Sequence, residues 1–150
     1  MRVVIQRVKK ASVTINKETK AEISKGYVIL LGIENTDTVT DIEWLCGKIS
    51  RIRLFTDDND LMNKSICEVQ GNVLLISQFT LYASTKKGNR PSFTNAAEPS
   101  IAIPIYKEFI NHLQTVLGKP IETGEFGAHM EVALINDGPV TLTIDSKNKE

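Results

Sequence analysis

A short polar segment gives the first candidate for chemistry. Ser77, Gln78 and Thr80 interrupt the apolar run of "LLISQFTLYA", and hydroxyl and amide groups of this kind can position or activate a reacting group. Plain strand alternation, with Phe79 and Leu81 facing the core and the polar residues facing water, explains the same pattern. The residues alone leave both interpretations open.

A basic loop follows this segment directly. In "STKKGNRPSF", Lys86, Lys87 and Arg90 lie beside a glycine, so the loop could contact phosphates through charge and through backbone N–H groups. An ordinary solvated loop has the same composition. Because the chain carries 18 Lys and Arg against 18 Asp and Glu, any contact with nucleic acid must come from such a local patch.

The common catalytic patterns are missing from the sequence. His112 and His129 are the 2 histidines, and neither belongs to an HExxH motif or accompanies a G-x-S-x-G segment. Cys46 and Cys67 fit no CxxC spacing and are expected to be free thiols. The acidic "DDND" segment lacks the rest of an EF-hand pattern. We therefore expect no metal and no cofactor.

The segment "NDGPVT", residues 136–141, contains a contradiction. Asp-Gly favours a type I′ hairpin turn, whose closing hydrogen bond would need an N–H group at position 139. Pro139 has none. Another geometry is required, and a type VI turn with a cis Gly138–Pro139 peptide is one such geometry.

Hydrophobic patterning predicts the elements that must position these residues. A helix of about 12 residues begins behind Asp37 or Thr38, and a second begins near Pro104 and ends at Gly118. Strands are expected in seven segments: 2–8, 11–15, 25–33, 51–55, 72–83, 130–134 and 140–144. The run at 25–33 is apolar throughout, as in a strand buried on both faces.

The count of elements favours an α+β fold. With many strands and two main helices, we expect a curved, barrel-like and mostly antiparallel sheet in a single domain. The domain should cover residues 1–146, followed by a frayed polar tail at 147–150. Without a signal-peptide pattern or a run of about 18 apolar residues, the protein is expected in the cytoplasm and not in a membrane.

Three segments together resemble the D-aminoacyl-tRNA deacylase family. They are "QRVKKASVTI", "SQFTLYASTKKGNRPSF" and "GEFGAHMEVALINDGPVT", and the likeness extends over residues 1–146. The resemblance implies the fold of that family and hydrolysis of the ester in D-aminoacyl-tRNA. It also implies a homodimer with active sites at the subunit interface.

The resemblance also implies roles for individual residues. Ser77, Gln78, Phe79 and Thr80 would form one wall of the active site, and Gly138 and Pro139 of the other subunit, with a cis peptide, would exclude L-residues. Arg7 would hold this selector in place, and Phe126, Ala128 and Met130 would lie toward the terminal adenosine.

The mechanism that the resemblance implies needs no protein base. The ribose hydroxyl beside the scissile ester would position or activate water, while backbone N–H groups near Phe79 and Thr80 would stabilise the oxyanion. A selector that excludes side chains should accept glycine, so hydrolysis of glycyl-tRNA is expected too.

Two positions depart from the family pattern, and two other functions compete with it. Asp60-Leu61-Met62-Asn63 stands where members commonly have Gly-Lys-Met-Asn, and Pro104 falls within an expected helix. One alternative is a nucleic-acid-binding module without catalysis, whose binding would depend steeply on salt. The other is a hydrolase of small esters that uses Ser77 or Thr80 as a nucleophile.

Overall fold

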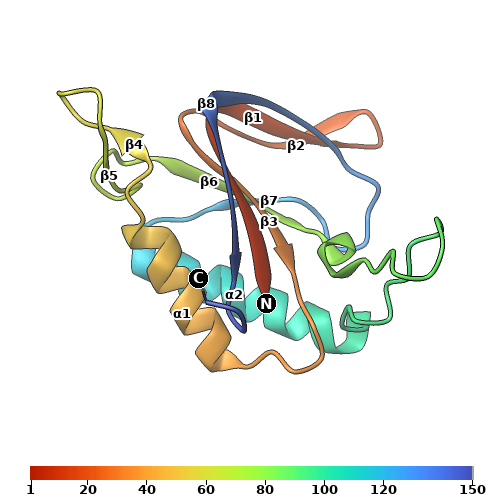
Figure 1. Ribbon diagram of the computed structural model, residues 1–150. Helices are drawn as coiled ribbons and strands as arrows, with labels where there is room; N and C mark the ends of the chain where they lie inside the picture. Colours follow the sequence, from red (N-terminus) through yellow and green to blue (C-terminus); the bar gives the residue numbers. More distant parts are fainter. Residues whose placement is uncertain (150) are drawn as a thin grey trace.

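One long strand organises the sheet. In the computed structural model, which describes residues 1–149, β1 (Arg2–Ile15) pairs antiparallel with β2 (Glu18–Ile23), β3 (Gly26–Gly32) and β8 (Glu131–Asp145). The first half of β1 pairs with β3 and its second half with β2, so the strand must bend between them. Figure 1 shows β1 and β8 bending together, which curls the sheet into an almost closed barrel.

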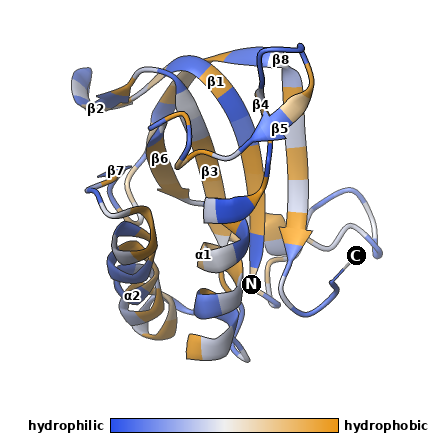
Figure 2. Cartoon of the chain, turned by 90° about the vertical axis from the view of Figure 1, so that its left-hand side faces the viewer, coloured by the Kyte–Doolittle hydropathy of each residue, from blue (hydrophilic) through white to orange (hydrophobic). Residues whose placement is uncertain are grey.

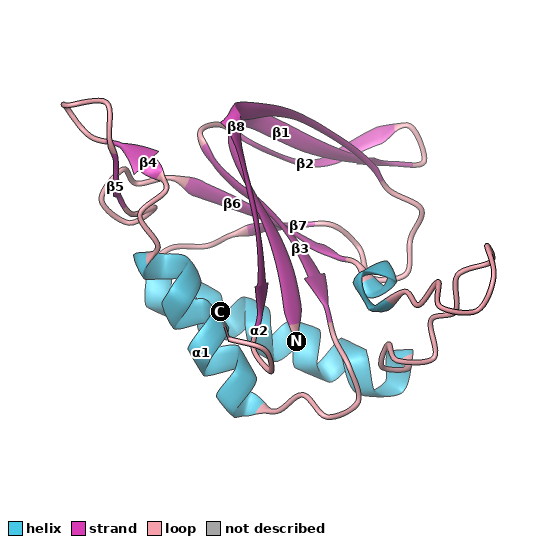
Figure 3. Ribbon diagram, viewed as in Figure 1, coloured by secondary structure: helices cyan, strands magenta, loops and turns pink. Residues whose placement is uncertain are grey.

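The other side of the sheet is parallel. β6 (Asn72–Ser77) pairs with β3 in parallel, and β7 (Glu122–Thr123) pairs with β6 in parallel, so the sheet is mixed. β4 (Phe55–Thr56) and β5 (Met62–Lys64) form a separate two-stranded hairpin. α1 (Val39–Arg51) and α2 (Pro99–Leu117) lie together on one side of the sheet (Figure 3). The predicted α+β, barrel-like fold is confirmed.

Alternation along the central strands divides the interior into two clusters. Tyr27, Ile29 and Leu31 of β3 face the helices and pack with residues such as Phe109. Val28 faces the other way, into a cluster inside the curled sheet that is closed by β2 and β6. Hydrophobic residues therefore recur along β1, β3 and β6 in Figure 2. The prediction that residues 25–33 are buried on both faces is confirmed.

The first helix begins as predicted. Thr38 is its N-cap, and the Thr38 N–H group donates to Asp41 Oδ2 at 2.9 Å. Burial raises the pKa of Asp41, but hydrogen bonds from Lys147, Ser146 and Thr38 outweigh burial and hold that pKa below its ordinary value. Lys147 also donates to the Thr36 carbonyl at 3.0 Å. Ser146 and Lys147 are thus held against α1, whereas Glu150 of the expected tail lies outside the described residues.

The second helix begins earlier than predicted. It starts at Pro99, not near Pro104, and ends at Gly118, whose φ of 67° suits glycine. Pro104 removes the hydrogen bond that its N–H group would have donated to the carbonyl of Ser100. That carbonyl lies in the first turn, where the chain is exposed to water, so the helix continues through the proline.

The strand boundaries differ from the prediction in several places. Segments 2–8 and 11–15 belong to one strand, and β2 was not predicted because only two of its six residues are buried. The strand expected at 51–55 is reduced to Phe55–Thr56. Segments 130–134 and 140–144 are parts of β8. The strand expected at 72–83 ends at Ser77, because a short 3₁₀ helix, η1 (Phe79–Tyr82), follows it.

Both cysteines are free thiols, as predicted. Cys46 is buried in the core, and burial raises its pKa to about 12, so this thiol stays protonated at neutral pH. Within residues 1–149, no helix is both long and apolar enough to cross a membrane.

Candidate active site

A cavity of about 260 Å³ brings together the two segments that were singled out separately in the sequence. One wall is the end of β6 with Ser77, Gln78 and Phe79, and the other is the loop before β8 with Phe126, Ala128 and Met130. The remaining lining residues are Leu31, Ile33, Ile76, Ala97, Ala102, Gly127, His129 and Val132. The cavity is mostly apolar, with polar groups at one edge, which suits a nucleoside-sized ligand.

The wall at residues 77–80 is a turn out of the sheet. The Gln78 N–H group donates to the Leu31 carbonyl at 2.7 Å, and the chain then enters η1. A Cβ atom on Gly32 would lie 3.0 Å from Leu81 Cβ and 3.2 Å from the Gln78 carbonyl oxygen, so glycine leaves the space that η1 occupies. The interpretation of this segment as ordinary strand alternation is therefore wrong.

The 3₁₀ turn reverses the expected burial. Phe79 is 56% exposed, and its ring meets Phe93 edge-on at 5.1 Å between centroids. Tyr82 is buried instead, and its hydroxyl donates to Glu34 Oε1 at 3.3 Å. An exposed aromatic side chain at the rim of a cavity can stack on a base or on a ribose of a bound nucleotide.

Gln78 and Thr80 are joined by a side-chain hydrogen bond. The Gln78 Nε2 atom donates to Thr80 Oγ1, so the Thr80 hydroxyl accepts there and its own proton is free to be donated elsewhere. Within residues 1–149, no carboxylate or imidazole hydrogen-bonds to the Thr80 hydroxyl. The arrangement fits a hydroxyl that donates and positions better than one that attacks.

The opposite wall rests on the core. The rings of Phe126 and Tyr106 lie 5.8 Å apart, and the Tyr106 hydroxyl donates to the Leu75 carbonyl at 3.1 Å. Burial raises the pKa of Tyr106 to about 12, so this side chain supports Phe126 without exchanging protons at neutral pH. His129 also lines the cavity, although no sequence pattern marked it as a site residue.

The segment "NDGPVT" is a bulge within β8 and does not reverse the chain. Gln6 of β1 faces Thr141, and Val8 faces Asn136, so the four residues 137–140 of β8 lie opposite Arg7 alone. Both halves of β8 pair antiparallel with β1, so the prediction of two separate strands joined by a turn is wrong here. The Gly138–Pro139 peptide is cis, as the resemblance implies.

Side chains on both sides hold this bulge. Arg7, which is 8% exposed, donates from Nε to the Asp137 carbonyl at 2.8 Å and from Nη1 to the Leu54 carbonyl. Asn136 Oδ1 accepts from the Val140 N–H group at 2.8 Å. These bonds replace the strand pairing that the bulge interrupts.

Glycine is required at the centre of the bulge. Gly138 has a φ of 144°, a region that residues with side chains rarely adopt. A Cβ atom here would lie 2.7 Å from Val140 Cγ2 and 3.1 Å from Arg7 Nη2. Any other residue would displace Arg7 or the backbone of the bulge itself.

The bulge and the cavity of the same chain lie at opposite ends of the sheet. Val8, next to the bulge, pairs with Gly26, and Gly26 pairs with Asn72 at the start of β6. Ser77 lies five residues further along β6, so the two sites are separated by about 17 Å along the strand direction alone. In Figure 1 the bend of β8 and the turn after β6 lie in different parts of the molecule.

The basic loop stands apart from the cavity lining. Lys86, Lys87 and Arg90 are exposed in a loop that is closed by the pairing of Ser84 with Ser92. The departure at Asp60 lies in the hairpin loop between β4 and β5, also outside the cavity lining. Within residues 1–149, no group of three or more His, Cys, Asp or Glu residues could hold a metal ion.

Comparisons with known proteins identify the family of this chain. Residues 4–145 match the family described as D-Tyr-tRNA(Tyr) deacylase. A relative from Bacteroides fragilis named "D-aminoacyl-tRNA deacylase" is 63% identical over 150 residues, which cover 100% of both chains. A relative of the same name from Flavobacterium johnsoniae is 56% identical, again over 100% of both chains.

Two solved structures share the fold. One is described as "c-Myc DNA Unwinding Element Binding Protein", with a TM-score of 0.92 and 38% identity over 97% of this chain and 98% of that one. The other is described as "a probable eukaryotic D-amino acid tRNA deacylase", with a TM-score of 0.81 over 95% of this chain and 97% of that one. At 16% identity, the second supports the fold alone. The family match, which spans nearly the whole length, shows that this chain belongs to the D-Tyr-tRNA(Tyr) deacylase family.

Proposed function

We propose that this protein is a D-aminoacyl-tRNA deacylase, which hydrolyses the ester between a D-amino acid and the terminal ribose of tRNA in the cytoplasm. The observation that carries this proposal is the cavity in which Ser77, Gln78 and Phe79 meet Phe126, Ala128 and Met130. The terminal adenosine lies against the second wall, and the ester faces the polar residues of the first.

Chirality is selected by the backbone of Gly138 and Pro139. Carbonyl oxygens held beside the α-carbon of the substrate leave room for hydrogen on one side and none for a side chain. An L-residue clashes there, whereas a D-residue directs its side chain elsewhere. Glycine, which has no side chain, passes the selector, so glycyl-tRNA is also a substrate.

The selector works on the active site of a second copy of the chain. Because the bulge lies about 17 Å along the sheet from Ser77 of its own chain, it cannot reach its own cavity without unfolding β8. A twofold homodimer brings each bulge to the partner's cavity and forms two equivalent sites.

Water is activated with help from the substrate. The ribose hydroxyl next to the scissile ester positions the attacking water, and the N–H groups of Phe79 and Thr80 at the start of η1 bind the developing oxyanion. Thr80 positions the substrate through its hydroxyl, which Gln78 orients. Replacing the terminal 2′-hydroxyl by hydrogen should therefore slow hydrolysis sharply, and full activity on that RNA would contradict this step.

The loop with Lys86, Lys87 and Arg90 serves to contact phosphates of the tRNA. Its cations are exposed, and η1 connects it to the first wall of the cavity. Such contacts add affinity for any tRNA and make binding sensitive to salt.

A direct test compares D-tyrosyl, L-tyrosyl and glycyl esters on one tRNA. We expect release of D-tyrosine and glycine at catalytic enzyme concentrations, with little release of L-tyrosine. Cleavage of the L-ester at a comparable rate would rule out the selector. If none of the three esters is cleaved, the deacylase function itself is wrong.

Subunit mixing tests whether the site is shared. Gly138→Ala displaces the bulge that enters the partner's cavity, and Ala128→Trp fills the adenosine side of the cavity, so each homodimer should have little activity on D-tyrosyl-tRNA. A mixed dimer has one site with an intact selector and an intact cavity, so random mixing should restore about a quarter of the wild-type rate. Failure to restore activity, despite mixed dimers detected by native mass spectrometry, would place both parts in one chain.

A second candidate function is nucleic-acid binding without catalysis. It is favoured by the name of one solved neighbour, "c-Myc DNA Unwinding Element Binding Protein". Such a module would bind charged and uncharged RNA equally and release no amino acid. Stereospecific turnover in the assay above would exclude it.

A further inference from the structure

The anchor of the proposed selector includes one carbonyl group that is distant from the bulge in sequence. Arg7 donates from Nε to the Asp137 carbonyl at 2.8 Å and from Nη1 to the Leu54 carbonyl. Two hydrogen bonds fix both the position and the orientation of a guanidinium group, whereas a single bond leaves it free to rotate. The place of the Leu54 carbonyl therefore decides where Arg7 holds the bulge.

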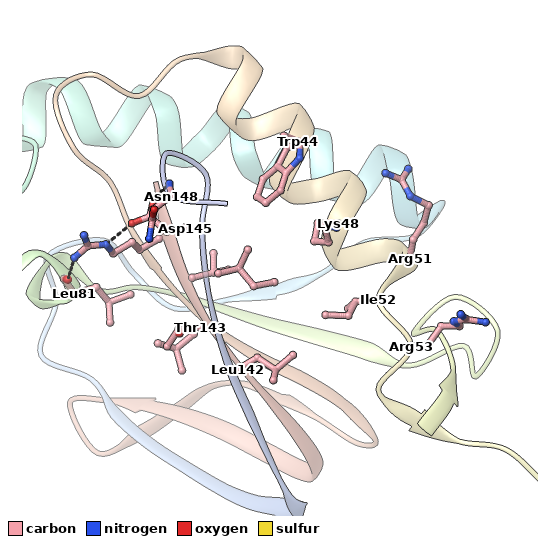
Figure 4. Close-up of a pocket in the computed structure, with 14 residues that line it drawn as sticks. Trp44, Lys48, Arg51, Ile52, Arg53, Leu81, Leu142, Thr143, Asp145 and Asn148 are labelled. Atoms are coloured by element: carbon pink, nitrogen blue, oxygen red, sulfur yellow. Dashed lines mark hydrogen bonds and ion pairs between the residues drawn. The ribbon is translucent and has the colours of Figure 1, made fainter. Parts of the chain in front are cut away.

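The segment that carries Leu54 lies between two elements of secondary structure. Residues 52–54 connect α1 to β4 and belong to neither. Ile52 lines a second cavity, a groove of about 810 Å³ between α1 and the last residues of β8 (Figure 4). One side of the segment thus borders open space, and Leu54 itself is buried. The position of the Leu54 carbonyl therefore depends on the packing of its neighbours and not on strand pairing.

Phe55 supplies this packing. The Leu54 carbonyl belongs to the planar peptide group that ends at the Phe55 nitrogen, so the carbonyl follows any movement of Phe55. Phe55 is buried, and its ring stacks on Tyr27 with 5.0 Å between the centroids and 19° between the planes. Lys25 Nζ lies 5.4 Å from the centre of the Phe55 ring. The contacts that hold this ring therefore also hold the peptide group that accepts from Arg7.

Tyr27 connects the Phe55 ring to the sheet. In the antiparallel pairing of β1 with β3, Tyr27 lies directly opposite Arg7, so the two side chains leave the same face of the sheet as neighbours. On its other side, Tyr27 pairs with Val73 of β6. Because β3 lies between two paired strands, the Tyr27 ring has a fixed origin. Tyr27 thus fixes Phe55, and Phe55 fixes the second acceptor of Arg7.

We propose that Phe55 is a positioning residue for chiral selection, which acts through the Leu54 carbonyl and Arg7 on the bulge at Gly138. The proposal rests on the selector function proposed above. Phe55 does not line the cavity of the proposed active site. Its replacement should therefore change which stereoisomer is accepted more than how tightly the tRNA binds.

The first test is the ratio of kcat/KM for D-tyrosyl-tRNA to kcat/KM for L-tyrosyl-tRNA. Phe55→Leu keeps an apolar side chain but removes the flat ring that stacks on Tyr27. We expect this D/L ratio to fall about 10-fold or more, because misplacement by about 1 Å can cost about 100-fold. KM for D-tyrosyl-tRNA should change less than about threefold. An unchanged D/L ratio would overturn the proposal.

Phe109→Leu is the matched control. Phe109 is buried in the same hydrophobic cluster as Phe55, but it lies on α2, where its carbonyl oxygen is 3.9 Å from Cys46 Sγ of α1. This variant should lose a similar amount of stability in urea unfolding and keep the D/L ratio of the wild type. If both variants lower the ratio equally, general loosening of the core explains the effect, and the role of Phe55 is wrong.

A conservative variant of Tyr27 isolates the stacked ring. Within residues 1–149, the Tyr27 hydroxyl is the one buried side-chain oxygen or nitrogen without a hydrogen-bond partner. Tyr27→Phe therefore keeps the stack on Phe55 and removes an oxygen that anchors no other group. The D/L ratio should stay within about twofold of wild type. A fall as large as that of Phe55→Leu would assign the effect to the hydroxyl and contradict the proposal.

A double-mutant cycle tests whether Phe55 acts through Arg7. Arg7→Lys keeps the positive charge but loses the planar fork that donates to both carbonyl groups. If both residues act on the bulge along one path, adding Phe55→Leu to Arg7→Lys should lower the D/L ratio by less than about twofold further. Two independent effects that multiply in the double variant would contradict the proposal.

Hydrogen exchange separates this proposal from the deacylase function, because it needs no substrate. The Arg7 Nε–H group donates to the Asp137 carbonyl, so NMR should show slow exchange of this proton in the wild type. Exchange should be about 10-fold faster or more in Phe55→Leu and unchanged in Phe109→Leu. If the wild type cleaves no ester, the deacylase function fails, and faster exchange in Phe55→Leu still assigns Phe55 to the anchor. Equal exchange in Phe55→Leu and the wild type would overturn the proposal.

Discussion

The substitution Gly138→Ala probes the proposed selector at its centre. The added Cβ atom would lie 2.7 Å from Val140 Cγ2, 2.9 Å from the Val140 nitrogen and 3.1 Å from Arg7 Nη2. Since two of these atoms belong to the bulge and the third to its anchor, either the carbonyl groups or Arg7 must move. The backbone also has a φ of 144°, and such sparsely populated conformations cost about 1–3 kcal/mol for a residue with a side chain.

The expected result is a specific loss of activity with a modest loss of stability. A cost of about 1–3 kcal/mol lowers the melting temperature by roughly 2–12 °C in a chain of this size. We expect kcat/KM for D-tyrosyl-tRNA to fall about 100-fold or more, because small misplacements in an active site have effects of this size. The ratio of D- to L-ester cleavage should fall as well.

Gly118→Ala is the matched control. Gly118 has a φ of 67°, but no heavy atom lies within 4 Å of the position of its Cβ, and it ends α2 away from both cavities. The control should lose about 1 kcal/mol of stability and keep its activity. If Gly138→Ala retains kcat/KM within about threefold of wild type and an unchanged D/L ratio, the backbone selector is refuted.

Three further predictions concern Thr80, Asn136 and Asp145. Thr80→Ala should keep kcat/KM within roughly tenfold of wild type, because it removes one hydrogen bond, whereas loss of a nucleophile costs up to about 10⁶ in kcat. Asn136→Ala leaves the Val140 N–H group unpaired and should lower the D/L ratio, and Asn136→Asp, which keeps the acceptor, should restore the ratio. Burial raises the pKa of Asp145, but hydrogen bonds from Arg2 and from the backbone of residues 147 and 148 outweigh burial, so the folded-state pKa is lowered. The lowered pKa stabilises the folded state above pH about 4, and this stabilisation is lost as the pH falls through the folded-state pKa of Asp145. Between pH 6 and pH 3, the free energy of unfolding of Asp145→Asn, measured in urea, should therefore fall less than that of the wild type.

Strong periodic signals explain which elements could be predicted. β3 is apolar at successive positions because each face packs against its own cluster, and α1 shows apolar residues at three-to-four spacing behind Thr38. β2 lacks such a signal, since its outward residues are polar and only Ala21 and Ile23 are buried. Its pairing is set by the hairpin with β1.

Tertiary contacts explain why the end of β6 was predicted wrongly. Phe79 and Leu81 alternate with Thr80 and Tyr82 as in a strand, so the local pattern does not distinguish a strand from a 3₁₀ turn. The close approach of η1 to Gly32 ends the strand, and Gly32 is distant in sequence. The site depends on this turn, because it exposes Phe79 at the cavity.

The bulge at Gly138 shows a similar limit. Asp-Gly followed by an alternating run predicts a chain reversal, and a bulge within one strand has the same local composition. The deciding fact is that residues on both sides pair with β1. Of the residues that the resemblance implies for the two walls, Ser77, Gln78, Phe79, Phe126, Ala128 and Met130 line the cavity and Thr80 does not, and their roles stay predictions. His129 and Val132 emerged as lining residues from the fold alone.

Because the proposed selector consists of backbone groups, its position depends on the side chains that hold the bulge. A side chain that excluded L-residues could rotate away, but a peptide carbonyl moves only with its strand. Arg7 fixes that strand to the Leu54 carbonyl, and Asn136 fixes it across the bulge, so the proposed selector is as rigid as the core behind it. Substitutions that loosen these anchors should therefore change stereospecificity before they unfold the protein. Since each selector would serve the partner's cavity, specificity and dimerisation would be lost together on dilution.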